Sequence, residues 1–207
     1  MNSFETDIKR AFCSIGFWTA FLGQVLILCA AGAQSDLFYM THPVLCTFPY
    51  TTAWLTDYQS GYIKAYLPRT GKTAYIMGKF LACGLAGGAA QAAGCAVYLL
   101  LWEKTVQMIP GLVFLSGMFW AQLGAVLSAV SNSRCIAYGG PFVINYLAVI
   151  LHERYFQNLY CLDPYEWLLP QHEWLFGTEG IHILVGGLIL LLYCVYQQVL
   201  RRYMEYV

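Results

Sequence analysis

The stretch FLACGLAGGAAQAAGCAVYLLLW, from Phe80 to Trp102, contains no charged residue. A helix of about 20 mainly apolar residues crosses the hydrocarbon core of a bilayer, where unpaired backbone amides are too costly for open structures. Comparable uncharged runs fill most of the remaining chain. They are Ala11–Ser35, Leu37–Thr56, Thr105–Ser133, Cys135–His152 and Gly180–Leu200. The sequence therefore predicts an all-α polytopic membrane protein with six transmembrane helices.

Composition agrees with this prediction. The chain has 207 residues, of which 59% are hydrophobic and 11% are charged, whereas a soluble domain carries about 25% charged residues. We expect one transmembrane domain over residues 1–207, with spans at approximately 11–35, 37–56, 75–102, 108–132, 135–152 and 180–200. The net charge of zero gives no indication of a nucleic-acid partner.

The distribution of basic residues predicts the orientation. If both termini are cytoplasmic and the six spans alternate, the cytoplasmic side receives Lys9, Arg10, Lys64, Arg69, Lys72, Lys79, Arg134, Arg201 and Arg202. The opposite side receives only Lys104 and Arg154. Cytoplasmic loops of membrane proteins carry an excess of Lys and Arg. We therefore expect a multi-pass protein of the cell membrane with both termini in the cytoplasm.

Local patterns refine the first three spans. Phe4, Ile8 and Phe12 recur every four residues, which predicts a short interfacial helix before the first span; a frayed terminus is the alternative. In the second span, Pro43 is expected near the first turn and Pro49 in the interior, where it should bend the helix. The third span is rich in Gly and Ala, which favours close packing, either inside the bundle or against a second subunit.

Two polar segments separate the spans. The cytoplasmic one, Asp57–Lys79, reads DYQSGYIKAYLPRTGKTAYIMGK. It predicts a short helix that ends at Pro68. This helix lies between two spans, where another component could exert a force on it. The outer one, Glu153–Glu179, is rich in aromatic residues and interrupted by prolines. It predicts one or two interfacial or re-entrant helices that cap the bundle. The cap residues we single out are Tyr165, Trp167 and Trp174.

Sequence motifs for catalysis, nucleotide binding or metal binding are weak. Gly71-Lys72-Thr73 resembles the end of a phosphate-binding loop, but position 66 is Tyr where that loop has Gly. We therefore expect no ATP hydrolysis by this chain alone. The four His residues and Cys161 lack the spacing of a metal site, so no metal and no catalytic residue is assigned. No pair of ionisable residues is evident within the spans, which argues against a proton-coupled carrier.

The Asp57–Lys79 segment resembles the permease subunits of the ABC-2 type of ATP-binding-cassette transporters. In that family an acidic stretch leads to Gly, a short amphipathic helix, Leu-Pro or Ser-Pro, a basic residue and a Gly-Lys that opens the third span. The positions that correspond here are Asp57, Gly61, Leu67, Pro68, Arg69, Gly78 and Lys79. The chain departs from the pattern at Gln59 and Lys64, where the family often has acids. The six spans and the outer segment before the last span also match the family.

The resemblance implies a partnership. Two such permeases would pair, as a homodimer or heterodimer, and each would bind a cytoplasmic ABC ATPase subunit that carries the ATP and Mg; no cofactor is expected on this chain. The coupling helix would contact the ATPase through residues of the segment after the second span. These residues are Asp57, Gly61, Tyr62, Ala65, Tyr66, Leu67, Pro68 and Arg69.

The sequence is compatible with two functions. The first is a permease that exports a peptide, lipid-linked or amphipathic compound, with ATP hydrolysis on a separate chain. The second is a membrane enzyme or an accessory scaffold without an ATPase partner. An enzyme should present a cluster of ionisable residues at the membrane face, and the sequence alone reveals none. Copurification of an ATPase would distinguish the two.

Overall fold

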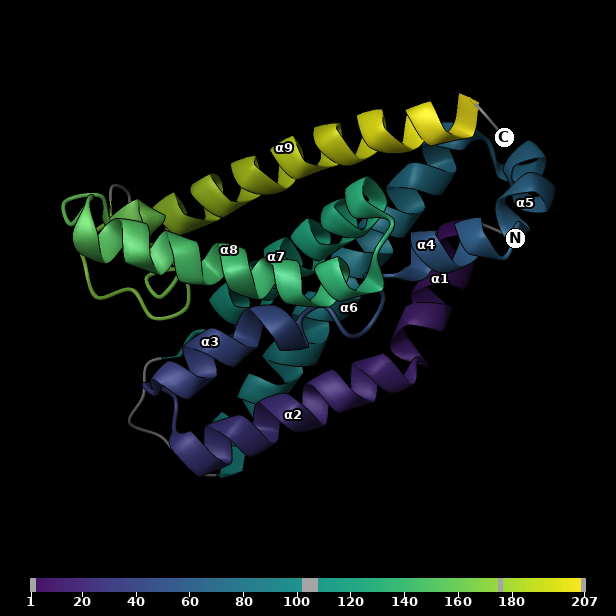
Figure 1. The fold of residues 1–207 in the computed structure, drawn as a ribbon. Coiled ribbons are helices and arrows are strands. Elements are labelled where there is room, and N and C mark those ends of the chain that lie inside the picture. The colour runs from purple at the N-terminus through teal and green to yellow at the C-terminus, as the bar shows by residue number, and fades with distance from the viewer. Residues whose placement is uncertain (1–2, 102–107, 175–176, 206–207) are drawn as a thin grey trace.

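A computed structural model describes residues 3–101, 108–174 and 177–205, without the side chains of Ser3, Ala65 and Arg69. The described residues form helices and turns and contain no strand. The helices are α1 (Ser3–Phe12), α2 (Ile15–Ala31), α3 (Asp36–Leu45), α4 (Ala53–Gln59), α5 (Tyr62–Thr70), α6 (Lys72–Leu101), α7 (Pro110–Ser131), α8 (Arg134–Arg154), the 3-10 turn η1 (Tyr160–Leu162) and α9 (Thr178–Glu205). The all-α prediction is confirmed (Figure 1).

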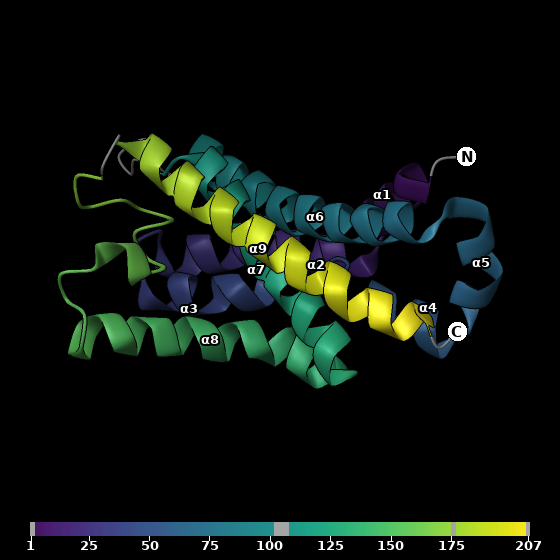
Figure 2. The ribbon, with the colours of Figure 1, turned by 90° about the horizontal axis from the view of Figure 1, so that it is seen from above.

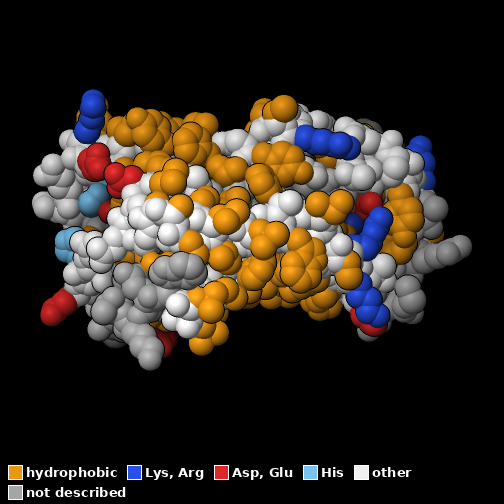
Figure 3. Space-filling view, turned by 90° about the horizontal axis from the view of Figure 1, so that it is seen from below, with side chains coloured by type: hydrophobic (Ala, Val, Ile, Leu, Met, Phe, Trp, Pro, Cys, Tyr) orange, Lys and Arg blue, Asp and Glu red, His pale blue; other side chains and the backbone are white. Residues whose placement is uncertain are grey.

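The helices form an elongated bundle with two chemically different ends. The start of α1, the end of α9, α4 and α5 lie together at one end, and the segment between α8 and α9 lies at the other (Figures 1 and 2). We call the first the basic end, because it carries most of the described Lys and Arg residues, and the second the acidic end. On the face drawn in Figure 3, most of the Lys and Arg side chains lie toward the basic end and most of the Asp and Glu side chains toward the acidic end, with few charged side chains between them.

Four helices, α6, α7, α8 and α9, are individually long and apolar enough to cross a membrane. The pair α1 and α2, which bend by 50° at their junction, gives a fifth candidate if it is counted as one span. The expected second span is not a single helix. Long apolar helices nevertheless indicate a membrane-spanning protein.

The second expected span is broken at Pro49. Helix α3 ends at Leu45, residues 46–52 form turns, and α4 begins at Ala53. A proline ring clashes with the carbonyl four residues earlier, which here belongs to Leu45, the last residue of α3. The expected bend is therefore a full break. Pro43 lies in the last turn of α3 and not near its start, because Ser35 caps the helix by accepting the N–H of Phe38.

The junction of α1 and α2 is held by Ser14. Its hydroxyl oxygen accepts the N–H of Phe17 at 3.0 Å, which starts α2, and it also lies 3.0 Å from the carbonyl of Pro49. The N-terminal helix predicted from the sequence is thus present, but its buried residues are Asp7 and Ala11, whereas Phe4 is exposed. Helix α1 therefore turns a carboxylate toward the bundle.

Helices α6 and α7 form the centre of the bundle. A Cβ atom on Gly88 would lie 2.5 Å from the carbonyl oxygen of Phe114, and one on Gly87 would lie 2.7 Å from that of Cys46. Only glycine permits backbones to approach this closely. The expectation that the third span is packed inside the bundle is confirmed. Helices α8 and α9 lie at the periphery and expose many large apolar side chains, including Phe142, Leu147 and Leu190.

Candidate functional site

The strongest cluster of chemical groups surrounds Lys79, at the basic end of α6. The ammonium nitrogen Nζ lies 2.7 Å from Asp57 Oδ2 and 2.9 Å from Asp7 Oδ1. It also donates a hydrogen bond to the hydroxyl oxygen of Tyr50 at 2.9 Å. The side chains of Lys79, Asp7 and Asp57 are 2%, 5% and 6% exposed, respectively. We call these three residues the ion cluster.

The ion cluster joins three helices. Asp7 comes from α1, Asp57 from α4 and Lys79 from α6, and two tyrosines complete it. The hydroxyl of Tyr50, in the break between α3 and α4, donates to Asp7 Oδ1 at 2.6 Å. The hydroxyl of Tyr75, on α6, donates to Asp57 Oδ2 at 3.1 Å.

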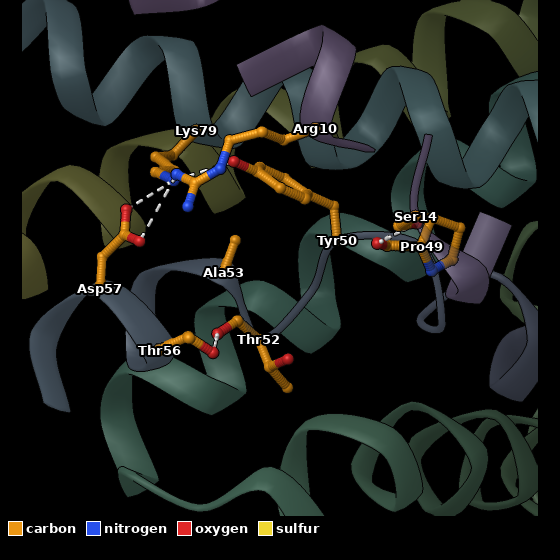
Figure 4. A pocket seen from close by; sticks show the side chains of 9 residues that line it. All are labelled: Arg10, Ser14, Pro49, Tyr50, Thr52, Ala53, Thr56, Asp57 and Lys79. Carbon is orange, nitrogen blue, oxygen red and sulfur yellow. Dashed lines mark hydrogen bonds and ion pairs between the residues drawn. The ribbon is translucent and has the colours of Figure 1, made fainter. Parts of the chain in front are cut away.

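A pocket of about 220 Å³ adjoins the ion cluster. It is lined by Arg10, Ser14, Pro49, Tyr50, Thr52, Ala53, Thr56, Asp57 and Lys79. Figure 4 shows the guanidinium of Arg10 lying over the cavity beside Lys79. Arg10 Nη1 is 3.7 Å from Asp57 Oδ1, and the Arg10 side chain is 50% exposed. Arg10 therefore adds a second, looser counter-charge at the open side of the cluster.

The bonding pattern decides what the ion cluster can do. An ammonium group has three donors, and those of Lys79 have three close acceptors: Asp7, Asp57 and Tyr50. Two carboxylates balance Lys79 and Arg10 in charge. No donor of Lys79 remains for a substrate, so the arrangement suits a joint between helices better than a nucleophile or a base.

Sequence reasoning did not find this cluster and took the spans to contain no ionisable pair. Of its three members only Lys79 lies within a predicted span, 75–102, whereas Asp7 and Asp57 lie just outside the first and second predicted spans, and the fold brings them together from three separate helices. One signal was available. Asp57 and Lys79 each lie at the basic end of a run of apolar residues, so helices packed side by side place them at one depth.

The residues assigned to the coupling helix divide into two groups. Asp57 lies in α4 and is buried in the ion cluster. Gly61, with φ of 71°, forms the turn into α5. Tyr62 is 41% exposed, and its ring stacks on that of Tyr66, with 5.1 Å between the centroids. Tyr66 in turn meets the edge of the Tyr75 ring.

Helix α5 itself differs from the prediction at its end. Pro68 does not terminate the helix. Its last residue is Thr70, and Gly71, with φ of 77°, is the C-cap. The only helical hydrogen bond that Pro68 removes would reach Lys64, an exposed residue. Leu67 is half-buried, while Ala65 and Arg69 have side chains outside the described part.

A second pocket lies behind α5. Its volume is about 370 Å³, and it is bordered by Lys64, Leu67, Pro68, Gly71, Lys72 and Met204. Lys72 donates from Nζ to the carbonyl oxygen of Met204 at 3.2 Å, so α6 is tied to the end of α9. Helix α5 stands at the extremity of the basic end, beyond the helices of the bundle (Figure 2).

The segment at the acidic end is ordered by turns. The expectation of interfacial or re-entrant helices is wrong for residues 155–174, where the three-residue η1 is the sole helix. Pro164 and Pro170 interrupt the segment, and Glu166 replaces helical hydrogen bonds by accepting the N–H groups of Gln171 and His172.

The proposed cap residues pack inward. Trp167 is 6% exposed, and its ring meets the edge of the Phe119 ring on α7. Tyr165 stacks on Tyr39 of α3 at 4.3 Å between centroids. The indole N–H of Trp174 donates to Glu166 Oε2 at 3.3 Å. The segment is thus attached to the bundle by aromatic contacts.

Glu166 is the electrostatic centre of this segment. Burial opposes ionisation, but hydrogen bonds from His172, Gln171 and Trp174 outweigh it and lower the pKa of Glu166. Asp163 has the opposite balance, because burial raises its pKa more than the N–H of Tyr165 lowers it.

Comparison of this chain with family models, with curated proteins and with solved structures finds no match. Among the described residues, no three His, Cys, Asp or Glu side chains are grouped so that they could hold a metal ion. The geometry of the two ends therefore carries the functional assignment.

Proposed function

We propose that this chain is the transmembrane permease subunit of an ABC transporter, driven by a separate cytoplasmic ATPase and exporting a peptide, lipid-linked or amphipathic compound. In this proposal the chain crosses the membrane six times, with α3, the break at 46–52 and α4 as the second crossing. The basic end is cytoplasmic, and a second permease completes the assembly. Separation of the basic and acidic ends supports the orientation.

One observation carries the proposal: α5 projects at the basic end and is linked through α4 to a buried ionic joint. Asp57 in α4 bonds Lys79 in α6, and Lys79 bonds Asp7 in α1. A force on α5 would therefore be transmitted to the N-terminal helix and to the central helix of the bundle together. Close ionic pairs held in a buried site resist separation, because removing one partner leaves an uncompensated charge.

The alternative, a membrane enzyme, is favoured by one feature, the pocket of about 220 Å³ beside the ion cluster. The ion cluster is also a set of ionisable residues such as a membrane enzyme is expected to present at the membrane face. Lys79, however, has all its donors engaged, and Asp57 accepts from both Lys79 and Tyr75. These contacts support a structural role for the cluster over a catalytic one.

The test is copurification of an ATPase with the tagged chain, followed by an ATPase assay. We expect Tyr62→Asp to remain in the membrane and to lose most of the bound ATPase, because it places a charge at an exposed aromatic contact. Tyr155→Asp is the matched control, since Tyr155 is 72% exposed at the acidic end. Equal recovery of ATPase with both variants would exclude α5 as the coupling helix.

A further inference from the structure

Four polar side chains lie inside the apolar bundle without adequate partners. They are Gln24 on α2, His42 on α3, Gln91 on α6 and Ser116 on α7, and each is at most 1% exposed. We call them the polar layer. Both amide atoms of Gln24 and of Gln91, His42 Nδ1 and Ser116 Oγ have no hydrogen-bond partner within the described protein.

The four residues all lie toward the acidic end of the bundle. Each is six to ten residues from the end of its helix at the acidic end, which at the rise of an α-helix is about 9–15 Å. The layer is therefore separated along the bundle from the ion cluster. Its members come from four different helices.

Close contacts connect the polar layer. The amide of Gln91 lies close enough to the His42 ring to interact with it. A Cβ atom on Gly117, next to Ser116, would lie 3.4 Å from Gln91 Cγ. A Cβ atom on Gly94, one turn after Gln91, would lie 2.8 Å from Gln24 Cγ.

Unpaired polar atoms in a buried site are costly, and most buried polar groups in native proteins bind protein or ordered water. The polar layer contains six of the ten buried side-chain atoms without a partner in the described residues. Amides and a hydroxyl both donate and accept, and Gln24, Gln91 and Ser116 carry no charge. The ligand that fits is small, neutral and able to donate and accept.

We infer that the polar layer binds water inside the membrane-embedded part of the bundle. A buried water makes about three hydrogen bonds, so six unpaired atoms can hold about two waters. This site is independent of the proposed transport function. It gives the contact between the central helices and α2 and α3 a wet interior, whereas the neighbouring contact of Gly88 with Phe114 is closely packed.

Hydroxyl-radical footprinting by X-rays, read by mass spectrometry on the full chain in lipid nanodiscs, tests this inference. Water bound beside a side chain makes its modification fast. His42 and Cys46 are the reporters, since Cys46 Sγ is 3.6 Å from His42 Nε2. Cys83 and Trp120, both 2% exposed, are buried controls outside the layer. We expect modification several-fold faster at Cys46 than at Cys83. Equal protection of the two cysteines would overturn the inference.

Variants separate bound water from slow penetration of solvent. Gln91→Leu should reduce modification of Cys46 to the level of Cys83, and Ser116→Ala should reduce it in part and serves if the first variant fails to fold. Gln122→Leu is the matched control, because the Gln122 amide donates to Phe80 at 3.5 Å and lies outside the layer. Unchanged modification of Cys46 in both layer variants would show that these residues do not hold the water.

Discussion

A single side chain, Lys79, makes the two shortest polar connections among α1, α4 and α6. Its 2% exposure is compatible with a charge only because two carboxylates and a tyrosine hydroxyl surround it. Buried ion pairs of this kind contribute little net stability relative to apolar residues, but they are strongly destabilising when one partner is removed. The effect of a substitution therefore depends on what it leaves behind.

Lys79→Met should destabilise the protein by about 3–5 kcal/mol, because Asp7 and Asp57 then lose their common counter-charge. Thermal unfolding in detergent measures this loss. Lys9→Met is the control: within the described part of the chain Lys9 pairs with Glu5 on the surface, where its side chain is 72% exposed, and such pairs are worth little. The prediction fails if the two variants unfold at the same temperature.

At the acidic end, Glu166 should make the segment between α8 and α9 sensitive to acid. Its folded-state pKa is lowered from the usual 4.5, so its contribution to stability is complete above about pH 4.5 and is lost as the pH falls through the lower, folded-state value. We expect tryptophan fluorescence of the segment, which contains Trp167 and Trp174, to change in that acidic range.

Glu166→Gln tests the assignment of this pH dependence. The amide cannot be titrated, so the acidic fluorescence transition should disappear while the remaining protein unfolds as before. Persistence of the transition at the same pH in this variant would assign it to another group, of which Asp163 is the nearest carboxyl group in sequence with a perturbed pKa.

Among the elements, α6 shows how small residues act differently at different positions. Gly87 and Gly88 face the turn after α3 and the backbone of α7 at distances that a Cβ atom does not allow. On α9, by contrast, a Cβ atom added to Gly186 or Gly187 would have no neighbouring atom within 4 Å among the described residues. Packing therefore requires glycine at these positions of α6. No contact within the described protein requires glycine at the two positions of α9.

Gly88→Ala should lower the unfolding temperature, since the added Cβ would lie 2.5 Å from the Phe114 carbonyl oxygen, and overpacking costs about 1–3 kcal/mol. Gly186→Ala should raise it, because alanine is about 1 kcal/mol better than glycine in a helix interior. Thermal unfolding of the two variants side by side is the measurement. The packing argument is refuted if both variants change in the same direction.

At the scale of the whole molecule, the positions of the two ends define an orientation that labelling can test. Cys161 lies in the segment at the acidic end, and Ser60 lies in the turn between α4 and α5 at the basic end. With a membrane-impermeant thiol reagent on sealed, right-side-out cells, we expect Cys161 to be labelled. A cysteine at position 60 should be labelled only after the membrane is permeabilised.

Two controls make this topology experiment decisive. Cys161→Ser should lose the outside label, and the Ser60→Cys variant should be examined in that background. Labelling of position 60 in intact cells would reverse the orientation and with it the cytoplasmic assignment of α5.

The apolar runs by themselves determined the all-α class and the positions of α6–α9, because hydrophobic length and helical hydrogen bonding act along a contiguous segment, and the recurrence of Phe4, Ile8 and Phe12 indicated an N-terminal helix. They did not determine where a helix breaks: Pro49 ended α3 at Leu45, and residues 155–174 formed turns. Only the tertiary structure decided that Asp7, Asp57 and Lys79 meet, since their approach depends on the packing of three helices far apart in the chain. The same holds for the polar layer, whose four members become neighbours only when four helices are packed together.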